Sequence, residues 1–214
     1  MSKKTKILTI SLLSTAMIGF CLFMILVLCK HNFKIDKFNG FIANNRTDSL
    51  VKFFKIFTHL GSFYTLALLI LIGALLLYFV AKKKRLAIFS AVTFALIAIS
   101  NFIFKHIVRR QRPLNFMLIN EMGYSFPSGH AMMSFAFFAI CIFIVCMFVK
   151  NKILKISLIC LFSALTIFVG FSRIYLGVHY LSDVVAGWLL SFVILICCWM
   201  VYNSKLFQLY QNKK

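Results

Sequence analysis

The chain has 214 residues, 62% of them apolar, and its 24 lysines and arginines outnumber four acidic residues to give a net charge of +20. This composition excludes an ordinary soluble domain. The basic residues lie between apolar stretches rather than on one polar face, so they favour anionic lipid headgroups and anionic substrates as partners, not nucleic acid.

Six apolar stretches set the expected architecture. A helix needs about 20 apolar residues to cross the hydrocarbon core of a bilayer. The stretches cover residues 7–29, 57–80, 86–104, 131–149, 153–171 and 184–202. We therefore expect an all-α fold, a six-span transmembrane helix bundle, forming a single membrane domain over residues 1–214 with a motif-bearing core at 57–202. The first stretch is longer than the apolar region of a secretory signal, and no cleavage site follows it, so we expect an uncleaved span.

Two further features concern the membrane surface. The segment DSLVKFFKIF at 48–57 alternates charge and bulk at helical spacing, which predicts an interfacial amphipathic helix between spans one and two. The basic turns KKKR at 82–85 and KNKILK at 150–155 favour a cytoplasmic N-terminus in a plasma membrane. The seven cysteines lie in or beside apolar stretches without ligand spacing, so we interpret them as small lipid-facing or packing residues rather than as disulfides or metal ligands.

Three polar segments interrupt the apolar pattern: KHIVRRQRP at 105–113, PSGH at 127–130 and SRIYLGVHYLSD at 172–183. The first follows span three, the second precedes span four, and the third joins spans five and six. Alternating spans therefore bring all three to one membrane face, which is the outer face in the favoured orientation.

These segments contain the groups that a phosphate site needs. Lys105, Arg112 and Arg173 provide positive charge, and the arginine fork matches two phosphate oxygens. Ser128 is placed to cap span four, whose first N–H groups and helix dipole attract an anion. Gly129 lets the backbone approach that anion closely.

Two histidines accompany these phosphate-binding residues, which we call the phosphate clamp. His179 and Asp183 are four residues apart at the expected start of span six, so they would share a helix face and form a hydrogen bond that leaves one imidazole nitrogen free to attack. His130 has no carboxylate in its motif and is a candidate general acid. A simple helical pair and headgroup anchoring are the structural alternatives, and anchoring remains our interpretation of Arg109 and Arg110.

Other residues have less specific surroundings. For His31, His59 and His106 we expect packing or interfacial roles. Tyr124 and Phe126 precede PSGH, and they either contact the substrate lipid or act as interfacial aromatics.

The pattern K-x6-RP, PSGH and SR-x5-H-x3-D resembles the type 2 phosphatidic acid phosphatase superfamily. It is carried by Lys105, Arg112, Pro113, Pro127, Ser128, Gly129, His130, Ser172, Arg173, His179 and Asp183, and THLGS at 58–62 is also typical. The six-span layout is similar to that of the bacterial phosphatidylglycerophosphatase B and undecaprenyl-diphosphate phosphatase branches.

The resemblance implies a role for each matched side chain. His179 would be the nucleophile that forms a phosphohistidine, Asp183 its orienting partner, and His130 the acid and base. The phosphate-binding residues would be Lys105, Arg112, Ser128, Gly129 and Arg173. The superfamily implies no metal and no cofactor, and four acidic residues are too few for a carboxylate-rich two-metal site.

We therefore expect an integral membrane enzyme that hydrolyses the terminal phosphate of a lipid phosphate. Phosphatidylglycerophosphate, phosphatidic acid and undecaprenyl diphosphate remain open as substrates, with specificity expected from residues 31–56 and 114–126. The alternative is a lipid phosphotransferase that passes the phosphoryl group to another lipid. A transporter is a third class, but its broken helices and paired half-repeats are absent from the sequence. The oligomeric state stays open.

Overall fold

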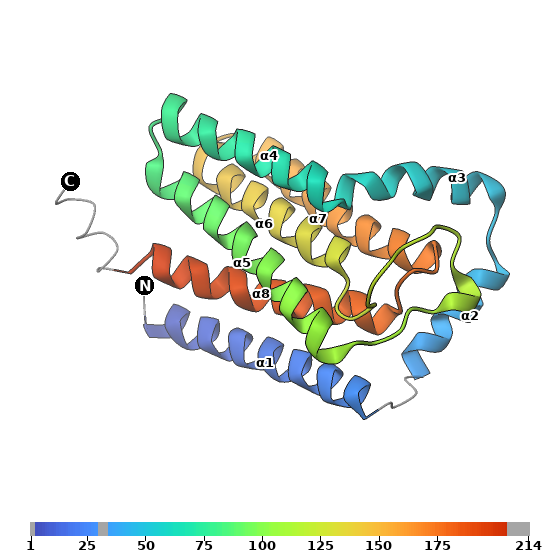
Figure 1. The fold of residues 1–214 in the computed structure, drawn as a ribbon. Coiled ribbons are helices and arrows are strands. Elements are labelled where there is room, and N and C mark those ends of the chain that lie inside the picture. The colour runs from blue at the N-terminus through green and yellow to red at the C-terminus, as the bar shows by residue number, and fades with distance from the viewer. Residues whose placement is uncertain (1–2, 30–33, 205–214) are drawn as a thin grey trace.

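The computed structural model describes residues 3–29 and 34–204, and Figure 1 shows them as a bundle of long helices. Within these residues there is no strand, and six helices are long and apolar enough to cross a membrane. The spans are α1 (Lys3–Leu28), α4 (Phe63–Leu75) with a π-helical turn at Leu76–Val80, α5 (Lys84–Val108), α6 (Gly129–Phe148), α7 (Lys152–Tyr175) and α8 (Leu181–Tyr202). The prediction of an all-α, six-span bundle is confirmed.

Several helix ends differ from the predicted bounds. α5 continues to Val108 instead of ending at 104, α7 continues to Tyr175 instead of 171, and α8 begins at Leu181 instead of 184. The extra turns contain Lys105, Arg173 or Asp183. These charged side chains have partners inside the protein, so the helices continue past the point where hydropathy alone predicts an end.

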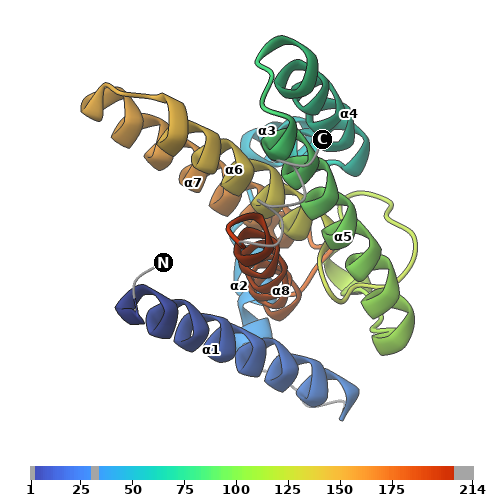
Figure 2. The same ribbon diagram turned by 90° about the vertical axis from the view of Figure 1, so that its left-hand side faces the viewer.

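The helices are arranged around α8. Figure 2 shows α8 in the middle of the bundle, and it packs against α1, α5 and α6. A Cβ atom at Gly170 of α7 would lie 2.3 Å from the ring of Trp188 on α8. Glycine at this position therefore lets α7 and α8 approach closely.

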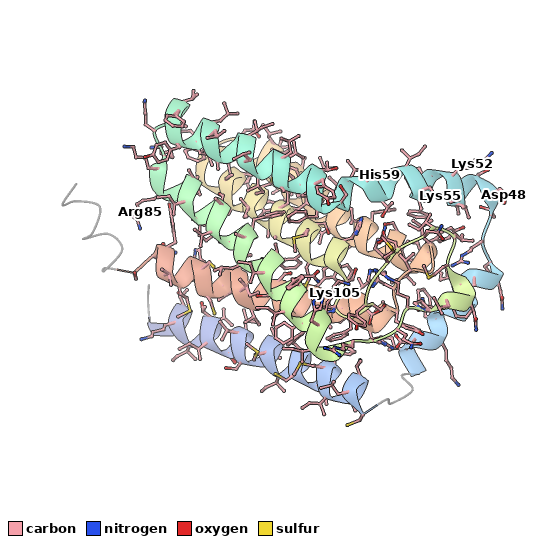
Figure 3. The ribbon with its side chains drawn as sticks, viewed as in Figure 1. Asp48, Lys52, Lys55, His59, Arg85 and Lys105 are labelled. Atoms are coloured by element: carbon pink, nitrogen blue, oxygen red, sulfur yellow. The ribbon has the colours of Figure 1, made fainter. Side chains whose placement is uncertain are left out.

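The short interspan elements gather at one end of the bundle, on the right in Figure 1, whereas α1 begins and α8 ends at the other. These elements are η1 (Lys34–Lys37), α2 (Phe38–Asn44), α3 (Asp48–Phe57), η2 (Thr58–Gly61) and η4 (Leu114–Phe116). α3 is the predicted amphipathic helix. Its Phe54 packs against Phe171 and Tyr175 of α7, with ring centroids 5.6 and 4.7 Å apart, while Lys52 and Lys55 are exposed (Figure 3). The helix is confirmed, and its place at a membrane interface stays a prediction.

The three polar segments meet at this same end, as the alternation of spans predicts. Figure 3 shows Lys105 near it and Arg85 at the opposite end. Backbone hydrogen bonds join the segments: Ser125 N donates to Arg110 O at 2.8 Å, and Ser128 N donates to Asp183 O at 3.1 Å. The first bond holds the segment after α5 against the loop that precedes α6, and the second holds the first turn of α8 against the same loop.

Gly177, in that turn, has a backbone conformation open mainly to glycine. Its φ is +71°, and a Cβ atom would lie 1.9 Å from the carbonyl oxygen of Phe116. We expect Gly177→Ala to lower the thermal midpoint of the detergent-solubilised protein, because the left-handed conformation alone costs about 1–3 kcal/mol and the clash adds to it. The matched control is Gly73→Ala in α4, where no atom lies within 4 Å of the added Cβ. It should leave the midpoint unchanged or raise it, and equal effects of the two substitutions would contradict this account.

Candidate active site

His179 lies in the turn between α7 and α8 and is 2% exposed. Its Nδ1 is 3.3 Å from Ser125 Oγ, and Ser125 Oγ in turn donates to Asp183 Oδ2. Its Nε2 is 3.3 Å from Nη1 of Arg112. This network is satisfied when Nδ1 carries the proton and donates to Ser125, which leaves the lone pair of Nε2 directed at Arg112.

The predicted direct hydrogen bond between His179 and Asp183 is wrong in its detail. The Nδ1 and Oδ2 atoms are 3.6 Å apart, too far for a hydrogen bond, and Ser125 bridges them. α8 begins at Leu181, so His179 precedes the helix instead of sharing its face. Asp183 accepts a hydrogen bond from Tyr180 N at 2.9 Å, which caps the helix and holds the carboxylate beneath the imidazole. Sequence reasoning missed Ser125, whose only signal was its position just before PSGH.

Arg112 and Lys105 are held by the loop that precedes α6. The Arg112 guanidinium donates to the carbonyl oxygens of Val178 (2.9 Å), Met122 (3.0 Å) and Gly123 (3.1 Å). The Lys105 ammonium donates to the carbonyl oxygen of Tyr124. Consecutive carbonyls of one loop thus fix two of the three predicted phosphate-binding cations, which come from α5 and the segment after it.

Arg173, the third predicted cation, is fully buried at the end of α7. It donates to Thr58 Oγ1 at 2.6 Å and forms an ion pair with Glu121, and Glu121 also lies 3.8 Å from Arg112. A carboxylate therefore bridges the two guanidinium groups that were predicted to bind phosphate. Sequence reasoning assigned no role to Glu121 or Thr58, although Thr58 belongs to the THLGS segment that the resemblance singled out.

The N-terminus of α6 completes this cluster. Ser128 caps the helix as predicted: its Oγ accepts a hydrogen bond from Ala131 N at 3.5 Å. His130 follows in the first turn of α6, so it lies at the same end of the bundle as His179, Arg112 and Arg173. Every predicted site residue therefore lies at this one end of the bundle: Lys105, Arg112, Ser128, Gly129, His130, Arg173, His179 and Asp183.

An apolar cavity of about 410 Å³ adjoins His130 between α4, α5 and α6. Its walls are Phe63, Ala98, Ile99, Asn101, Phe102, Gly129, His130 and Met133. Ile99 and Phe102 are 54% and 65% exposed, so the cavity opens on the outer surface of the bundle, where lipid would surround a membrane protein. A hydrocarbon chain in this cavity would lie beside the imidazole of His130.

The interpretation of Arg110 as a headgroup anchor is wrong. Its side chain is only 15% exposed, and it forms ion pairs with Asp183 and Asp36, each at 2.6 Å. The neighbouring Arg109 is exposed and donates to His106 O, which is compatible with anchoring. Hydropathy predicts the same surroundings for both arginines. Only the path of the chain after α5 places Arg110 inside the protein and Arg109 at its surface.

The remaining predictions have mixed outcomes. Phe126 is fully buried and stacks on Phe20 with ring centroids 6.1 Å apart, so it belongs to the core rather than to an interface. His59 and His106 are exposed, in agreement with interfacial positions, and His31 lies outside the described residues. The cysteines are free, as expected.

The charge state of His179 follows from its surroundings. Burial, followed by the charges of Lys105, Arg112 and Arg173, lowers the pKa of His179 well below its ordinary value of 6.5. A nucleophile must be neutral, so its activity is lost only as the pH falls through this lowered pKa. We expect the acid limb of kcat/KM, corrected for the phosphate of the substrate that titrates near pH 6, to lie below pH 6.5. An acid limb centred at or above pH 6.5 in this corrected profile would contradict the prediction.

Buried cations and two imidazoles at one end of a multi-span helical bundle are the features of an integral membrane hydrolase of the phosphatase class. The model of the PAP2 superfamily matches residues 85–206, which is more than half of the chain, and the chain belongs to this superfamily of lipid phosphatases.

Named relatives agree with this assignment. The chain is 31% identical over 144 residues to phosphatidylglycerophosphatase B of Bacillus subtilis, which covers 64% of this chain and 68% of that protein. It is 29% identical over 130 residues to an undecaprenyl-diphosphatase of Sulfolobus acidocaldarius, which covers 56% of each chain. The crystal structure of a transmembrane PAP2 type phosphatidylglycerolphosphate phosphatase from Bacillus subtilis superposes with a TM-score of 0.74 at 26% identity, over 87% of this chain and 94% of that one.

Proposed function

We propose that this chain removes the terminal phosphate of a lipid phosphate through a phosphohistidine on His179. The observation that carries the proposal is the environment of that imidazole. Its Nδ1 is held by Ser125 in front of Asp183, and its Nε2 faces Arg112 inside a cluster of cations. This arrangement holds the proton on Nδ1 and presents the lone pair of Nε2 to an anion.

In the proposed complex, the phosphoryl oxygens take the place of the Glu121 carboxylate between Arg112 and Arg173. The guanidinium forks and the Lys105 ammonium then bind the three outer oxygens, while the N–H groups after Ser128 direct the positive end of the α6 dipole at them. Donors fixed in advance stabilise the charge that develops on phosphorus in the transition state, which is commonly the largest contribution to catalysis.

The reaction then has two steps. Nε2 of His179 forms a bond to phosphorus as the bond from phosphorus to the lipid oxygen breaks, and His130 gives its proton to that oxygen. In the second step His130 takes a proton from water, the water oxygen bonds to phosphorus, and the bond from phosphorus to Nε2 breaks to release inorganic phosphate. The negative charge of the incoming phosphate favours the protonated form of His130 that the first step needs.

The cavity beside His130 supports a lipid as the leaving group. A chain lying along Ile99, Phe102 and Met133 would bring its phosphate ester to His130 from the membrane side. Phosphatidylglycerophosphate, phosphatidic acid and undecaprenyl diphosphate all combine such a chain with a terminal phosphate, and they are the substrate candidates.

We further propose that hydrolysis uses no metal ion. Three of the four carboxylates, Asp36, Glu121 and Asp183, already form ion pairs with Arg110, Arg112 or Arg173. A carboxylate engaged in this way is a poor ligand for a hard cation such as Mg²⁺. Lys105, Arg112 and Arg173 would instead neutralise the phosphate.

The same proposal includes the orientation in the membrane. The basic turns at 82–85 and 150–152 lie at the end opposite the site, and Figure 3 shows Arg85 there. Positive turns favour the cytoplasm, so the N-terminus would be cytoplasmic and the active site would face outward.

Purified protein in detergent tests the function. Phosphate release is measured from the three candidate lipids with excess chelator present. We expect release from at least one lipid that survives chelation and disappears in His179→Ala. No release from any lipid would overturn the proposal, and transfer of phosphate to a second lipid without free phosphate would replace it with the phosphotransferase alternative.

A further inference from the structure

Arg110 lies at the centre of a buried charge cluster outside the predicted phosphate clamp. Its Nη1 donates to Asp183 Oδ1 at 2.6 Å and to Ser182 Oγ at 2.7 Å, and its Nη2 donates to Asp36 Oδ2 at 2.6 Å. The guanidinium also lies 3.9 Å from the ring centroid of Tyr180. One planar fork thus joins a carboxylate of α8 to a carboxylate of η1, which belongs to a different part of the chain.

Asp36 also binds the first turn of α8. Its Oδ1 accepts a hydrogen bond from Ser182 N at 3.0 Å, and its Oδ2 accepts one from Ser182 Oγ at 2.9 Å. Three residues further along, the fully buried Asn39 donates from Nδ2 to the carbonyl oxygen of His179 at 2.8 Å. The segment of η1 and α2 therefore holds both the end of the turn that contains His179 and the first turn of α8, which contains Asp183.

The charges explain why this cluster matters for the reaction. Asp183 is fully buried and Asp36 is 9% exposed at the side chain, so both carboxylates need a cation nearby. Interactions with Asp183 and Asp36 raise the pKa of Arg110 despite its burial, so it remains charged. Lysine is a compact point charge and cannot reproduce a planar fork that bonds two carboxylates at once.

We propose that Arg110 and Asp36 are positioning residues for the reaction at His179. Arg110 fixes the plane of the Asp183 carboxylate through Oδ1. The other oxygen, Oδ2, accepts a hydrogen bond from Ser125, and Ser125 holds Nδ1 of His179. Asp36 fixes Arg110 and the first turn of α8 together. This inference rests on the proposed function, because it assigns these residues to the orientation of the same nucleophile.

The test compares Arg110→Lys, Asp36→Asn and their double variant with wild type, using as substrate the candidate lipid that wild type hydrolyses fastest and inorganic phosphate as product inhibitor. A misplaced nucleophile commonly costs about 10²-fold in rate. We expect each single variant to lower kcat about 10- to 100-fold and to change KM and the inhibition constant of inorganic phosphate less than threefold, since the phosphate clamp is untouched. The double variant should lose little more than the worse single one, because both act through one contact.

Arg109→Lys is the matched control, since Arg109 is exposed and next in sequence, and it should retain wild-type kcat. A wild-type kcat in Arg110→Lys and Asp36→Asn would overturn the inference while leaving the proposed function intact. A parallel loss of kcat, inorganic phosphate binding and thermal midpoint would also overturn it, because a purely structural role predicts that pattern. Absence of phosphate release from all three candidate lipids with the wild-type protein would instead count against the proposed function itself.

Discussion

His179→Ala is expected to lower the rate of phosphate release by about 10⁴-fold or more, the largest effect of any single substitution in this chain. Loss of a nucleophile removes the covalent route altogether, and what remains is the contribution of the cations and of substrate binding. Rapid quenching of the wild-type enzyme with a ³²P-labelled lipid should trap an acid-labile, base-stable phosphoprotein. The alanine variant should give no such species.

His130→Ala provides the contrast that tests the division of labour between the two imidazoles. General acid catalysis contributes about 10²–10⁴-fold, and its value depends on how much the leaving oxygen needs a proton. With p-nitrophenyl phosphate, whose leaving group is stable as an anion, His130→Ala should lose much less of kcat/KM, which reports the first step, than with a lipid phosphate. His179→Ala should be inactive with both substrates.

Exposed His106 supplies the control for these experiments, and His106→Ala should keep wild-type rates. If His179→Ala retained more than one hundredth of the wild-type rate, or if the labelled phosphate were found on another residue, the phosphohistidine mechanism would be wrong. Equal losses with both substrates in His130→Ala would remove His130 from the role of general acid.

Arg173→Gln is expected to produce the second largest effect, a loss of about 10²–10⁴ in kcat/KM. Arg173 can form two charge-assisted hydrogen bonds to the phosphoryl group, each worth about 1.5–3 kcal/mol. Its removal also leaves Glu121 without its closest cation and Thr58 Oγ1 without its donor. Breaking a buried pair costs about 3–5 kcal/mol, and the 28% exposure of the Glu121 side chain reduces this figure.

A double variant separates folding from phosphate binding. Arg173→Gln combined with Glu121→Gln removes the unpaired carboxylate, so the thermal midpoint should recover toward wild type. The loss in kcat/KM should not recover, because the guanidinium that binds phosphate is still absent. A double variant with wild-type kcat/KM would show that Arg173 serves only to balance Glu121.

Glu121 also indicates what substrate binding must displace. Its carboxylate lies between Arg112 and Arg173, and the carbonyl oxygens of residues 122–124 bond to Arg112 and Lys105. The loop before α6 therefore supplies hydrogen-bond acceptors or a carboxylate to all three cations. A phosphate that enters the proposed site must exchange with Glu121, so part of its binding energy offsets the loss of this ion pair.

The sequence by itself determined the membrane architecture and the end of the bundle where the site lies. Apolar length predicts six spans, and their alternation brings the three polar segments together without any knowledge of packing. Local patterns also predict the Ser128 cap and the helix at residues 48–57, because both depend only on neighbouring residues.

Only the tertiary structure decided how the polar groups are paired. Arg109 and Arg110 look alike in the sequence, but Arg109 takes a left-handed conformation at the end of α5 with φ +50°, and the chain turns Arg110 inward to Asp183. The Ser125 bridge and the ion pair between Glu121 and Arg173 likewise join residues 52 to 58 positions apart. Hydrophobic periodicity records which residues face lipid, but hydrogen bonds between distant segments depend on distances that exist only once the helices have packed.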